Sequence, residues 1–194
     1  TPEPGQDYMQ CGREKGQTSS QGCGTLIKLE EYLQQHQICP QCGQRAVMDA
    51  GGWINCLADE DSFFEFHRDL DVSRLLDKEV MTNYYREFLV KQEERSHFKE
   101  SLVTGEATVY GHSAILAVSD FYFSGGSMGV AFGEKFNQAV DRAIEKRYPF
   151  VPLCCSGGAR LYEGILALMQ MAKTIAAVLR LKRQGLPFIS ILGD

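Results

Sequence analysis

The second half of the chain alternates between short apolar runs and segments whose apolar residues recur every three or four positions. The run at 149–155 is short and almost wholly apolar, as is typical of a buried parallel strand. The helical spacing after it predicts a helix over about 160–184, ended by Gly185 with Pro187 beyond. Its recurring apolar positions are Ile165, Leu168, Met169, Ala172, Ile175, Ala176 and Leu179.

Similar patterns extend to the neighbouring segments. Residue periodicity and the turn residues between segments predict strands near 102–109, 113–119 and 187–192. A second amphipathic pattern predicts a helix over about 134–147, and glycines predict a loop at 124–129. The apolar face of that helix consists of Phe136, Ala139, Val140, Ala143 and Ile144. Strands that alternate with helices in this way indicate an α/β domain with parallel strands.

The pattern is different in the first half of the chain. Residues 1–10 contain Pro, Glu, Gly and Gln with little apolar content, so we expect a loose leader there. Residues 11–45 carry four cysteines and form a separate small module, and 46–101 indicate a mostly helical connection. The main core is then expected over 102–194.

Composition limits the class of protein. With 194 residues, 44% hydrophobic and 23% charged, the chain can bury one main core and a small appendage. A net charge of −5 weakens any general role in nucleic-acid binding. No apolar run approaches the roughly 20 residues of a membrane span. Seven cysteines without a recognisable signal peptide favour a reducing compartment.

A cysteine knuckle predicts a metal site in the small module. Cys39 and Cys42 stand in the sequence Cys-Pro-Gln-Cys-Gly, and fifteen residues separate Cys39 from Cys23. This is the spacing of a zinc ribbon, in which thiolates bind one tetrahedral Zn²⁺. The regular pattern would place a fourth cysteine at position 20, where this chain has Ser20.

The fourth ligand is therefore open to interpretation. We favour Cys11, with residues 12–22 as an enlarged loop inside the first knuckle. The alternatives are a site of three cysteines completed by His36 or water, and a ribbon that has lost its metal.

Gly157 and Gly158 stand between the predicted strand and the predicted helix. Without a Cβ they let a ligand approach the main chain closely. The unpaired amides of a helix's first turn, at its positive dipole end, attract phosphate or a developing oxyanion. The alternative is a tight connection with no ligand.

Several longer motifs follow the cysteine module in a fixed order. They are VYG at 109–111, DFYFSGGSMG at 120–129, GEKF at 133–136, SGGARLYE at 156–163, LMQMAKT at 168–174 and GLPFIS at 185–190. Together they closely resemble the β subunit of the bacterial and plastid type of acetyl-CoA carboxylase carboxyltransferase, in the crotonase-like superfamily. The resemblance covers nearly the whole chain from Cys11 onward.

The resemblance has departures that favour a specialised paralogue. They are the stretched first knuckle, Cys154-Cys155, Leu161-Tyr162, a shortened segment around 69–91 and Gly193 before Asp194. The family's second amide-bearing loop would follow Asp194, so we expect a chain that is truncated at its C-terminus.

The resemblance implies a fold and an activity. The fold would be a spiral ββα core of the crotonase-like type with an N-terminal zinc ribbon. The activity would be transfer of a carboxyl group from carboxybiotin, held on a biotin carboxyl carrier protein, to acetyl-CoA. The product is malonyl-CoA, used in fatty acid biosynthesis. Gly157 and Gly158 match the family's first amide-bearing loop and would stabilise the thioester enolate.

Binding residues and partners are implied in the same way. The loop residues Gly125, Gly126, Ser127, Met128 and Gly129 would shape the acyl-CoA site together with Ala159 and Arg160. The alternatives are a packing role for this loop and, for Arg160, pairing with Glu163 or Asp120. The partners would be a carboxyltransferase α subunit in an α2β2-type heterotetramer and the biotin carrier, in the cytoplasm or the plastid stroma. The bound groups would be Zn²⁺, carboxybiotin and the substrate acetyl-CoA.

Two other classes of function remain open. A non-catalytic zinc-ribbon module that binds RNA or protein would need a basic ribbon, and Lys15, Lys28 and Arg45 make only a modest one. A related acyl-CoA enzyme, such as a malonyl decarboxylase subunit or a natural-product-pathway carboxyltransferase, would keep the glycine loops. The ribbon argues against the decarboxylase.

The methionines Met128, Met169 and Met171 are expected in the core, and neither His67 nor His112 is assigned as a general base.

Overall fold

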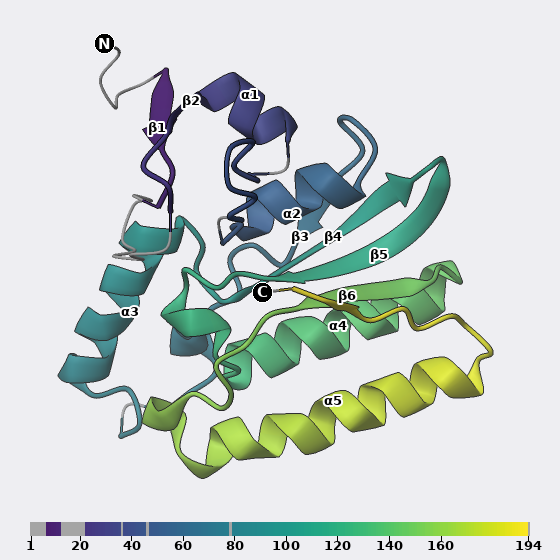
Figure 1. Cartoon of the computed structure of the whole chain (residues 1–194). Coiled ribbons are helices and arrows are strands. Elements are labelled where there is room, and N and C mark those ends of the chain that lie inside the picture. The colour runs from purple at the N-terminus through teal and green to yellow at the C-terminus, as the bar shows by residue number, and fades with distance from the viewer. Residues whose placement is uncertain (1–6, 13–21, 36, 46, 78, 194) are drawn as a thin grey trace. The chain divides into compact units, whose positions relative to one another are not determined.

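The computed structural model describes residues 7–12, 22–35, 37–45, 47–77 and 79–193. These residues fall into two compact units, Thr1–Met48 and Asp49–Asp194, and each unit is described by itself. Figure 1 traces both along the chain. Ser20 and His36, which enter the alternatives for the metal site, lie outside the described residues.

The smaller unit is built on a short antiparallel pair. Strand β1 (Tyr8–Gln10) pairs with β2 (Leu26–Lys28), and helix α1 (Leu29–Gln34) follows directly. The core of this unit consists of Met9, Cys11, Ile27, Tyr32 and Cys39. The expectation of a loose leader over 1–10 is therefore wrong for β1, while residues 1–6 lie outside the described part.

The larger unit contains a five-stranded sheet in the order β3-β4-β5-β6-β7. Its strands are β3 (Phe64–Phe66), β4 (Leu102–Val109), β5 (His112–Ser119), β6 (Phe150–Cys154) and β7 (Ile191–Leu192). The pairs β3–β4 and β4–β5 are antiparallel, whereas β5, β6 and β7 are parallel. Tyr110 and Gly111, both with positive φ, make the tight turn between β4 and β5.

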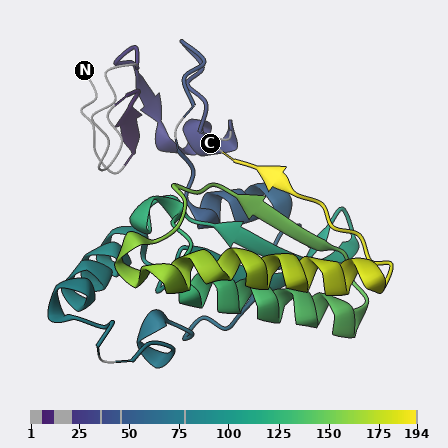
Figure 2. The same ribbon diagram turned by 90° about the horizontal axis from the view of Figure 1, so that it is seen from below.

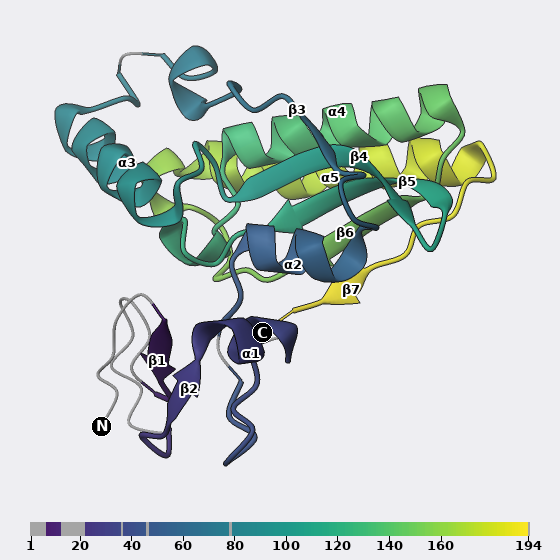
Figure 3. The same cartoon turned by 90° about the horizontal axis from the view of Figure 1, so that it is seen from above.

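Two long helices make the parallel crossovers. Helix α4 (Val130–Lys146) joins β5 to β6, and α5 (Ile165–Arg183) joins β6 to β7. They lie side by side on one face of the sheet (Figures 1 and 2). Helix α2 (Ala50–Leu57) lies on the opposite face (Figure 3). The two faces bury alternate strand residues, such as Ile115 toward α4 and Leu116 toward α2.

The remaining helices are α3 (Asn83–Ser96) and three short 3₁₀ turns, Val72–Arg74, Ser124–Gly126 and Leu161–Glu163. Helices alone therefore do not account for the connection 46–101, since β3 within it extends the sheet. Within the part of the chain that the structure describes, no helix combines the length and apolarity needed to cross a bilayer.

Helix α5 differs from its prediction in two ways. It begins at Ile165 rather than near residue 160, because Gly164, at φ 55° and ψ −130°, separates it from the preceding 3₁₀ turn. Its apolar stripe also faces outward, while the inward face carries Ala167, Gln170, Ala177 and Leu181. Met169 and Met171 are exposed, so their expected place in the core is wrong; Met128 does pack against the core.

The predicted strand at 187–192 is also shorter than expected. Only Ile191–Leu192 forms β7, although Phe188 makes an isolated parallel bridge to Phe150. Strands β4, β5 and β6 and helix α4 confirm their predicted positions, with α4 beginning at Val130 directly after the glycine-rich loop.

Candidate functional site

Two glycine-containing loops meet at the carboxyl ends of the parallel strands β5 and β6. The backbone N–H of Met128 donates to Gly158 O at 2.8 Å, and the N–H of Arg160 donates to Met128 O at 2.8 Å. The N–H of Gly157 donates to Gly125 O at 2.7 Å. Ligand sites in α/β sheets form at this end of the strands. The structure thus brings the two predicted segments, 125–129 and 157–160, together.

Close contact between the loops depends on the absence of side chains. Gly126 has φ 67°, and a Cβ built there would overlap the carbonyl oxygen of Cys155. A Cβ on Gly129 would overlap the carboxylate of Glu163 and come within 2.8 Å of Arg160 Nη1. Larger residues at these two positions would force the loops apart.

The two predicted oxyanion donors are not equivalent. The N–H of Gly157 is already engaged by Gly125 O. The N–H of Gly158 donates to the hydroxyl of Ser156 at 3.1 Å, at an exposed position, so a ligand can replace that partner. Around Gly158 no atom of the described residues lies within 4 Å of a Cβ built on it. Neither glycine belongs to the first turn of α5, so the expected help from that helix dipole is wrong.

Arg160 is buried rather than open to a ligand. Its side chain is 1% exposed, and Nη1 donates to Glu100 Oε2 at 2.9 Å while Nη2 contacts the other oxygen of that carboxylate. Nη1 also lies 3.4 Å from Glu163 Oε1, and the guanidinium stacks over Phe123 at 5.2 Å. Arg160 is therefore not exposed to an acyl-CoA ligand, as its expected part in shaping that site would require. Of the alternative partners, the structure has Glu163 and not Asp120.

The carboxylates nearby serve the fold. Burial tends to raise the pKa of Glu100, but the charge and hydrogen bonds of Arg160 outweigh it and leave that pKa below its usual value. Asp120 accepts from the N–H groups of Ala50 at 2.8 Å and Phe123 at 2.9 Å. Burial raises the pKa of Asp120 despite these bonds. Asp120 therefore ties α2 to the end of β5.

Sequence reasoning offered Glu163 as a partner of Arg160 but missed Glu100, which makes the bidentate pair, and Tyr85, which bonds to Glu163. Glu100 precedes β4 in a stretch with no periodic pattern, and Tyr85 lies 78 positions before Glu163, to which its hydroxyl donates at 2.5 Å. The available signal was a general rule: buried charges in proteins are almost always paired. An arginine buried at a loop therefore requires carboxylates nearby.

The four cysteines of the smaller unit form a cluster. The sulfurs of Cys11, Cys23, Cys39 and Cys42 all lie within 4.8 Å of one another, and all four residues are free thiols. Cys11 Sγ lies 3.6 Å from Cys42 Sγ, and Cys23 Sγ lies 3.7 Å from Cys39 Sγ. A tetrahedral ion with bonds of about 2.3 Å to sulfur separates its ligands by roughly 3.8 Å. The donor set therefore fits a tetrahedral metal ion, with Cys11 as the fourth member.

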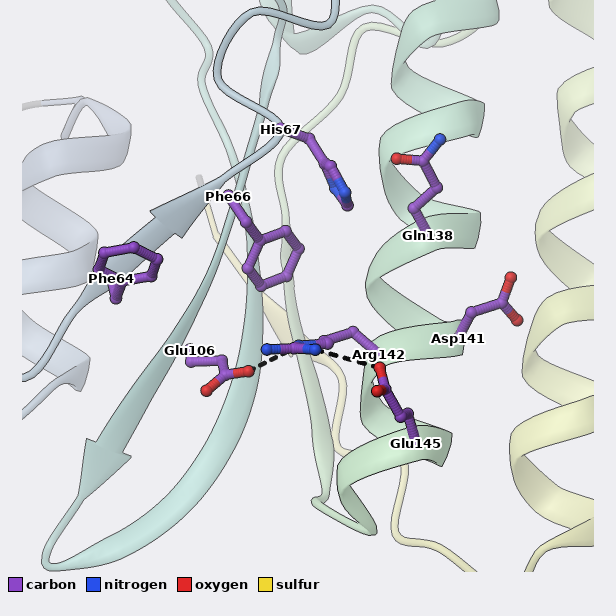
Figure 4. A pocket seen from close by; sticks show the side chains of 8 residues that line it. All are labelled: Phe64, Phe66, His67, Glu106, Gln138, Asp141, Arg142 and Glu145. Atoms are coloured by element: carbon purple, nitrogen blue, oxygen red, sulfur yellow. Dashed lines mark hydrogen bonds and ion pairs between the residues drawn. The ribbon is translucent and has the colours of Figure 1, made fainter.

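Two cavities accompany these features. An apolar one of about 370 Å³ touches Ser156 and Met128, both neighbours of Gly158 through hydrogen bonds, and continues between α4 and α5 past Phe132 and Val178. A second, of about 510 Å³, lies between β3, β4 and α4 (Figure 4). There Arg142 is held between Glu106 at 2.7 Å and Glu145 at 3.1 Å. These charges satisfy one another.

Comparisons with known proteins agree along most of the chain. The family profile described as the carboxyl transferase domain matches residues 71–193. The acetyl-coenzyme A carboxylase carboxyl transferase subunit beta of Herpetosiphon aurantiacus is 38% identical over 172 residues, which are 89% of this chain and 58% of that protein. The subunit of the same name from Clostridium kluyveri is 33% identical over 173 residues, with the same two shares.

A solved structure has a similar fold. Transcarboxylase 12S, with methylmalonyl-coenzyme A and methylmalonic acid bound, matches with a TM-score of 0.60 and 28% identity. The match covers 75% of this chain and 26% of that one. The chain spans 58% of the length of the curated relatives named above.

Proposed function

Because the chain belongs to the carboxyl transferase domain family, we propose that it forms part of the β subunit of an acetyl-CoA carboxylase carboxyltransferase. The family resemblance inferred from the motifs is confirmed, as is the α/β fold of the crotonase-like carboxyltransferases. The reaction would transfer a carboxyl group from carboxybiotin, on a biotin carboxyl carrier protein, to acetyl-CoA. It would yield malonyl-CoA.

The observation that carries this proposal is the exposed amide of Gly158. In the transfer, the methyl carbon of acetyl-CoA would lose a proton to the biotin nitrogen that is released as the N–C bond of carboxybiotin breaks, and would form the new C–C bond with the carboxyl carbon. Negative charge would develop on the thioester oxygen as the proton leaves, before the C–C bond is complete. A fixed backbone N–H stabilises such charge without reorganising, and losing one such donor costs about 10²–10³ in kcat. The N–H of Gly158 would donate to this oxygen in place of Ser156 Oγ.

The other loop residues would have supporting roles. Gly125, Gly126, Ser127, Met128, Gly129 and Ala159 would shape the acyl-CoA site. Gly157 and Arg160 would hold the two loops together, since the amide of one and the guanidinium of the other are already engaged. Residues whose donors are already engaged within the fold are thus assigned to holding the loops, and the others to contact with the ligand.

In the smaller unit, Cys11, Cys23, Cys39 and Cys42 would hold Zn²⁺ as thiolates. The sulfur–sulfur distances support a closed site of four protein ligands, which is the structural rather than the catalytic type. The ion would stabilise the fold of this unit, whose core includes Cys11 and Cys39.

The proposal includes partners and a location. The carboxyltransferase α subunit would complete the active site in an α2β2-type heterotetramer, and the biotin carrier would deliver the carboxyl group. The site would operate in the cytoplasm or the plastid stroma, where free thiols persist.

The test is malonyl-CoA formation from acetyl-CoA and carboxybiotin by the full-length protein mixed with its α subunit. Gly158→Leu would fill the space at the exposed amide and should lower kcat about 100-fold. Gly111→Leu is the matched control, because Gly111 also has positive φ (76°) and open space around its Cβ position, within the described residues, in the β4–β5 turn. It should retain activity.

Three outcomes separate the functions. Activity that needs both subunits and falls only in Gly158→Leu supports the proposal. Turnover of another acyl-CoA instead of acetyl-CoA identifies a specialised paralogue. No acyl-CoA turnover by the full-length pair refutes the enzymatic function and favours a binding module.

A further inference from the structure

Resting on the proposed function, we propose that Arg160 is a positioning residue, whose buried guanidinium fixes the loop that carries Gly158 against the loop at 124–129. The two loops contain five glycines, Gly125, Gly126, Gly129, Gly157 and Gly158. Glycines have no side chains with which to pack, so hydrogen bonds must set the position of these loops. Arg160 makes several of these bonds.

Arg160 bonds to the opposite loop through both its main chain and its side chain. Its guanidinium donates from Nη2 to Ser127 O at 2.8 Å and from Nε to Ser127 Oγ at 3.3 Å. Its backbone N–H donates to Met128 O, and the N–H of Met128 donates in turn to Gly158 O. Only one residue, Met128, stands between Arg160 and Gly158 in this chain of bonds.

Two buried carboxylates hold the guanidinium in place. Glu100 accepts from both terminal nitrogens of Arg160 in a bidentate pair, and Ser101 Oγ lies 3.1 Å from Nη2. The side chains of Arg160, Glu100 and Glu163 are each at most 1% exposed. The planar, forked geometry of an arginine suits this pair, and a lysine cannot reproduce it.

Glu163 extends the network to two helices. Its Oε2 accepts from the N–H of Val130, the first residue of α4, at 2.5 Å. Its Oε1 accepts from the hydroxyl of Tyr85 on α3 at 2.5 Å. Gly129, the N-cap residue of α4, has no side chain with which to cap the helix, so Glu163 does this from another segment.

The buried charges are balanced. Lys135 is 2% exposed, donates to Leu102 O at 3.2 Å and interacts with the Glu100 carboxylate. The buried network thus contains the carboxylates of Glu100 and Glu163, which both pair with Arg160, and the charge of Lys135 acts on Glu100. Removing one partner of such a group leaves a buried charge without compensation, so the loops would have to rearrange to admit water.

The first test uses the amide of Gly157 as a reporter, in the full-length protein. Its bond to Gly125 O protects it from hydrogen exchange only while the loops are in register. Arg160→Lys should speed exchange of this amide at least tenfold. Arg142→Lys is the matched control: Arg142 also lies between two glutamates, Glu106 and Glu145, but on the surface of α4 (Figure 4). It should leave the exchange rate unchanged.

The second test is kinetic, with the α subunit present. Arg160→Lys should lower kcat by roughly 10- to 100-fold while the KM for acyl-CoA changes less than threefold, because the displaced amide serves the transition state. Arg142→Lys should change neither. If Arg160→Lys fails to fold, Tyr85→Phe replaces it, since it removes only the hydroxyl bond to Glu163. The exchange rate of the Gly157 amide should then rise, and kcat should fall, each by about threefold.

Unchanged exchange at Gly157 in the folded variant would overturn the inference. Faster exchange with unchanged kcat would also overturn it, because the network would then be structural only. A wild-type protein that turns over no acyl-CoA would instead refute the proposed function, and the exchange experiment would still decide whether Arg160 holds the loop.

Discussion

The main chains of Gly12 and Gly22 lie against each other. A Cβ built on Gly12 would stand 2.7 Å from the Cα of Gly22, and one built on Gly22 would overlap Gly12 in turn. These glycines adjoin Cys11 and Cys23, two members of the thiol cluster. In space, therefore, Cys11-Gly12 and Gly22-Cys23 together have the spacing of a Cys-x-x-Cys knuckle.

Deletion of residues 13–21, with Gly12 joined directly to Gly22, should leave a metal site intact. The product would read Cys-Gly-Gly-Cys, and the four sulfurs would keep their positions because the two glycines are already in contact. We expect one zinc ion per chain before and after deletion. The zinc content is measured as the metal released when the cysteine thiols are chemically modified. Cys11→Ser is the comparison variant and should lose the ion. Loss of zinc on deletion would show that Cys11-Gly12 and Gly22-Cys23 do not form one knuckle.

Gly126→Ala should be considerably more destabilising than Gly125→Ala. Both residues have positive φ, 67° and 63°, so the backbone strain is matched. A Cβ at Gly126 overlaps Cys155 O, whereas one at Gly125 meets no described atom within 4 Å. We expect Gly126→Ala to lose about 1–3 kcal/mol more in urea unfolding. Equal losses would show that the loops can move apart freely.

The outward direction of the apolar stripe on α5 can be tested at two adjacent positions. Ala177 is fully buried against α4, and Ala176 is exposed. Ala177→Leu should therefore cost about 1–3 kcal/mol through overpacking, while Ala176→Leu should stay within about 0.5 kcal/mol. Thermal unfolding of the two variants makes the comparison. The reverse order would mean that the helix is rotated.

Acid stability should depend on Glu134, which joins α4 to α5. A hydrogen bond from Lys173 holds the pKa of Glu134 below its ordinary 4.5, although partial burial opposes this. Its stabilising contribution is thus fully present above pH 4.5 and is lost as the pH falls through the lowered folded-state pKa.

Glu134→Gln should remove that part of the acid dependence, worth less than about 1 kcal/mol because the pair is partly exposed. Glu145→Gln, the same change at a more exposed position of α4, is the control. The readout is the free energy of unfolding from pH 6 to pH 3. Parallel curves for wild type and Glu134→Gln would contradict the role of the Lys173 contact.

The sequence predicted those elements whose burial leaves a pattern. Strands β5 and β6 contain continuous apolar runs, β4 begins and ends with apolar residues, and α4 has a clear inward face. Strand β3 was missed because Phe64-Glu65-Phe66 is too short to show a period. On α5 the apolar spacing identified the helix but not its orientation, since periodicity does not tell which face packs against α4.

The candidate site was predicted to a similar degree. The motifs identified the loops and the four cysteines, but local spacing does not show which donors are already used within the fold. Gly157 donates to Gly125, and Arg160 pairs with Glu100, sixty positions away. Such long-range pairings follow from the three-dimensional arrangement, and they decide which groups a ligand can meet.

The order of strands in the sheet has a consequence for how quickly the larger unit forms. Strands β4 and β5 are joined by the two-residue turn Tyr110–Gly111, so pairing them closes almost no loop. Strand β6 must find β5 across the whole of α4, and β7 must find β6 across α5. The entropy of closing a loop rises with its length. Folding of the sheet therefore loses least entropy if it begins at the β4–β5 hairpin, and the two parallel pairings limit the rate of folding.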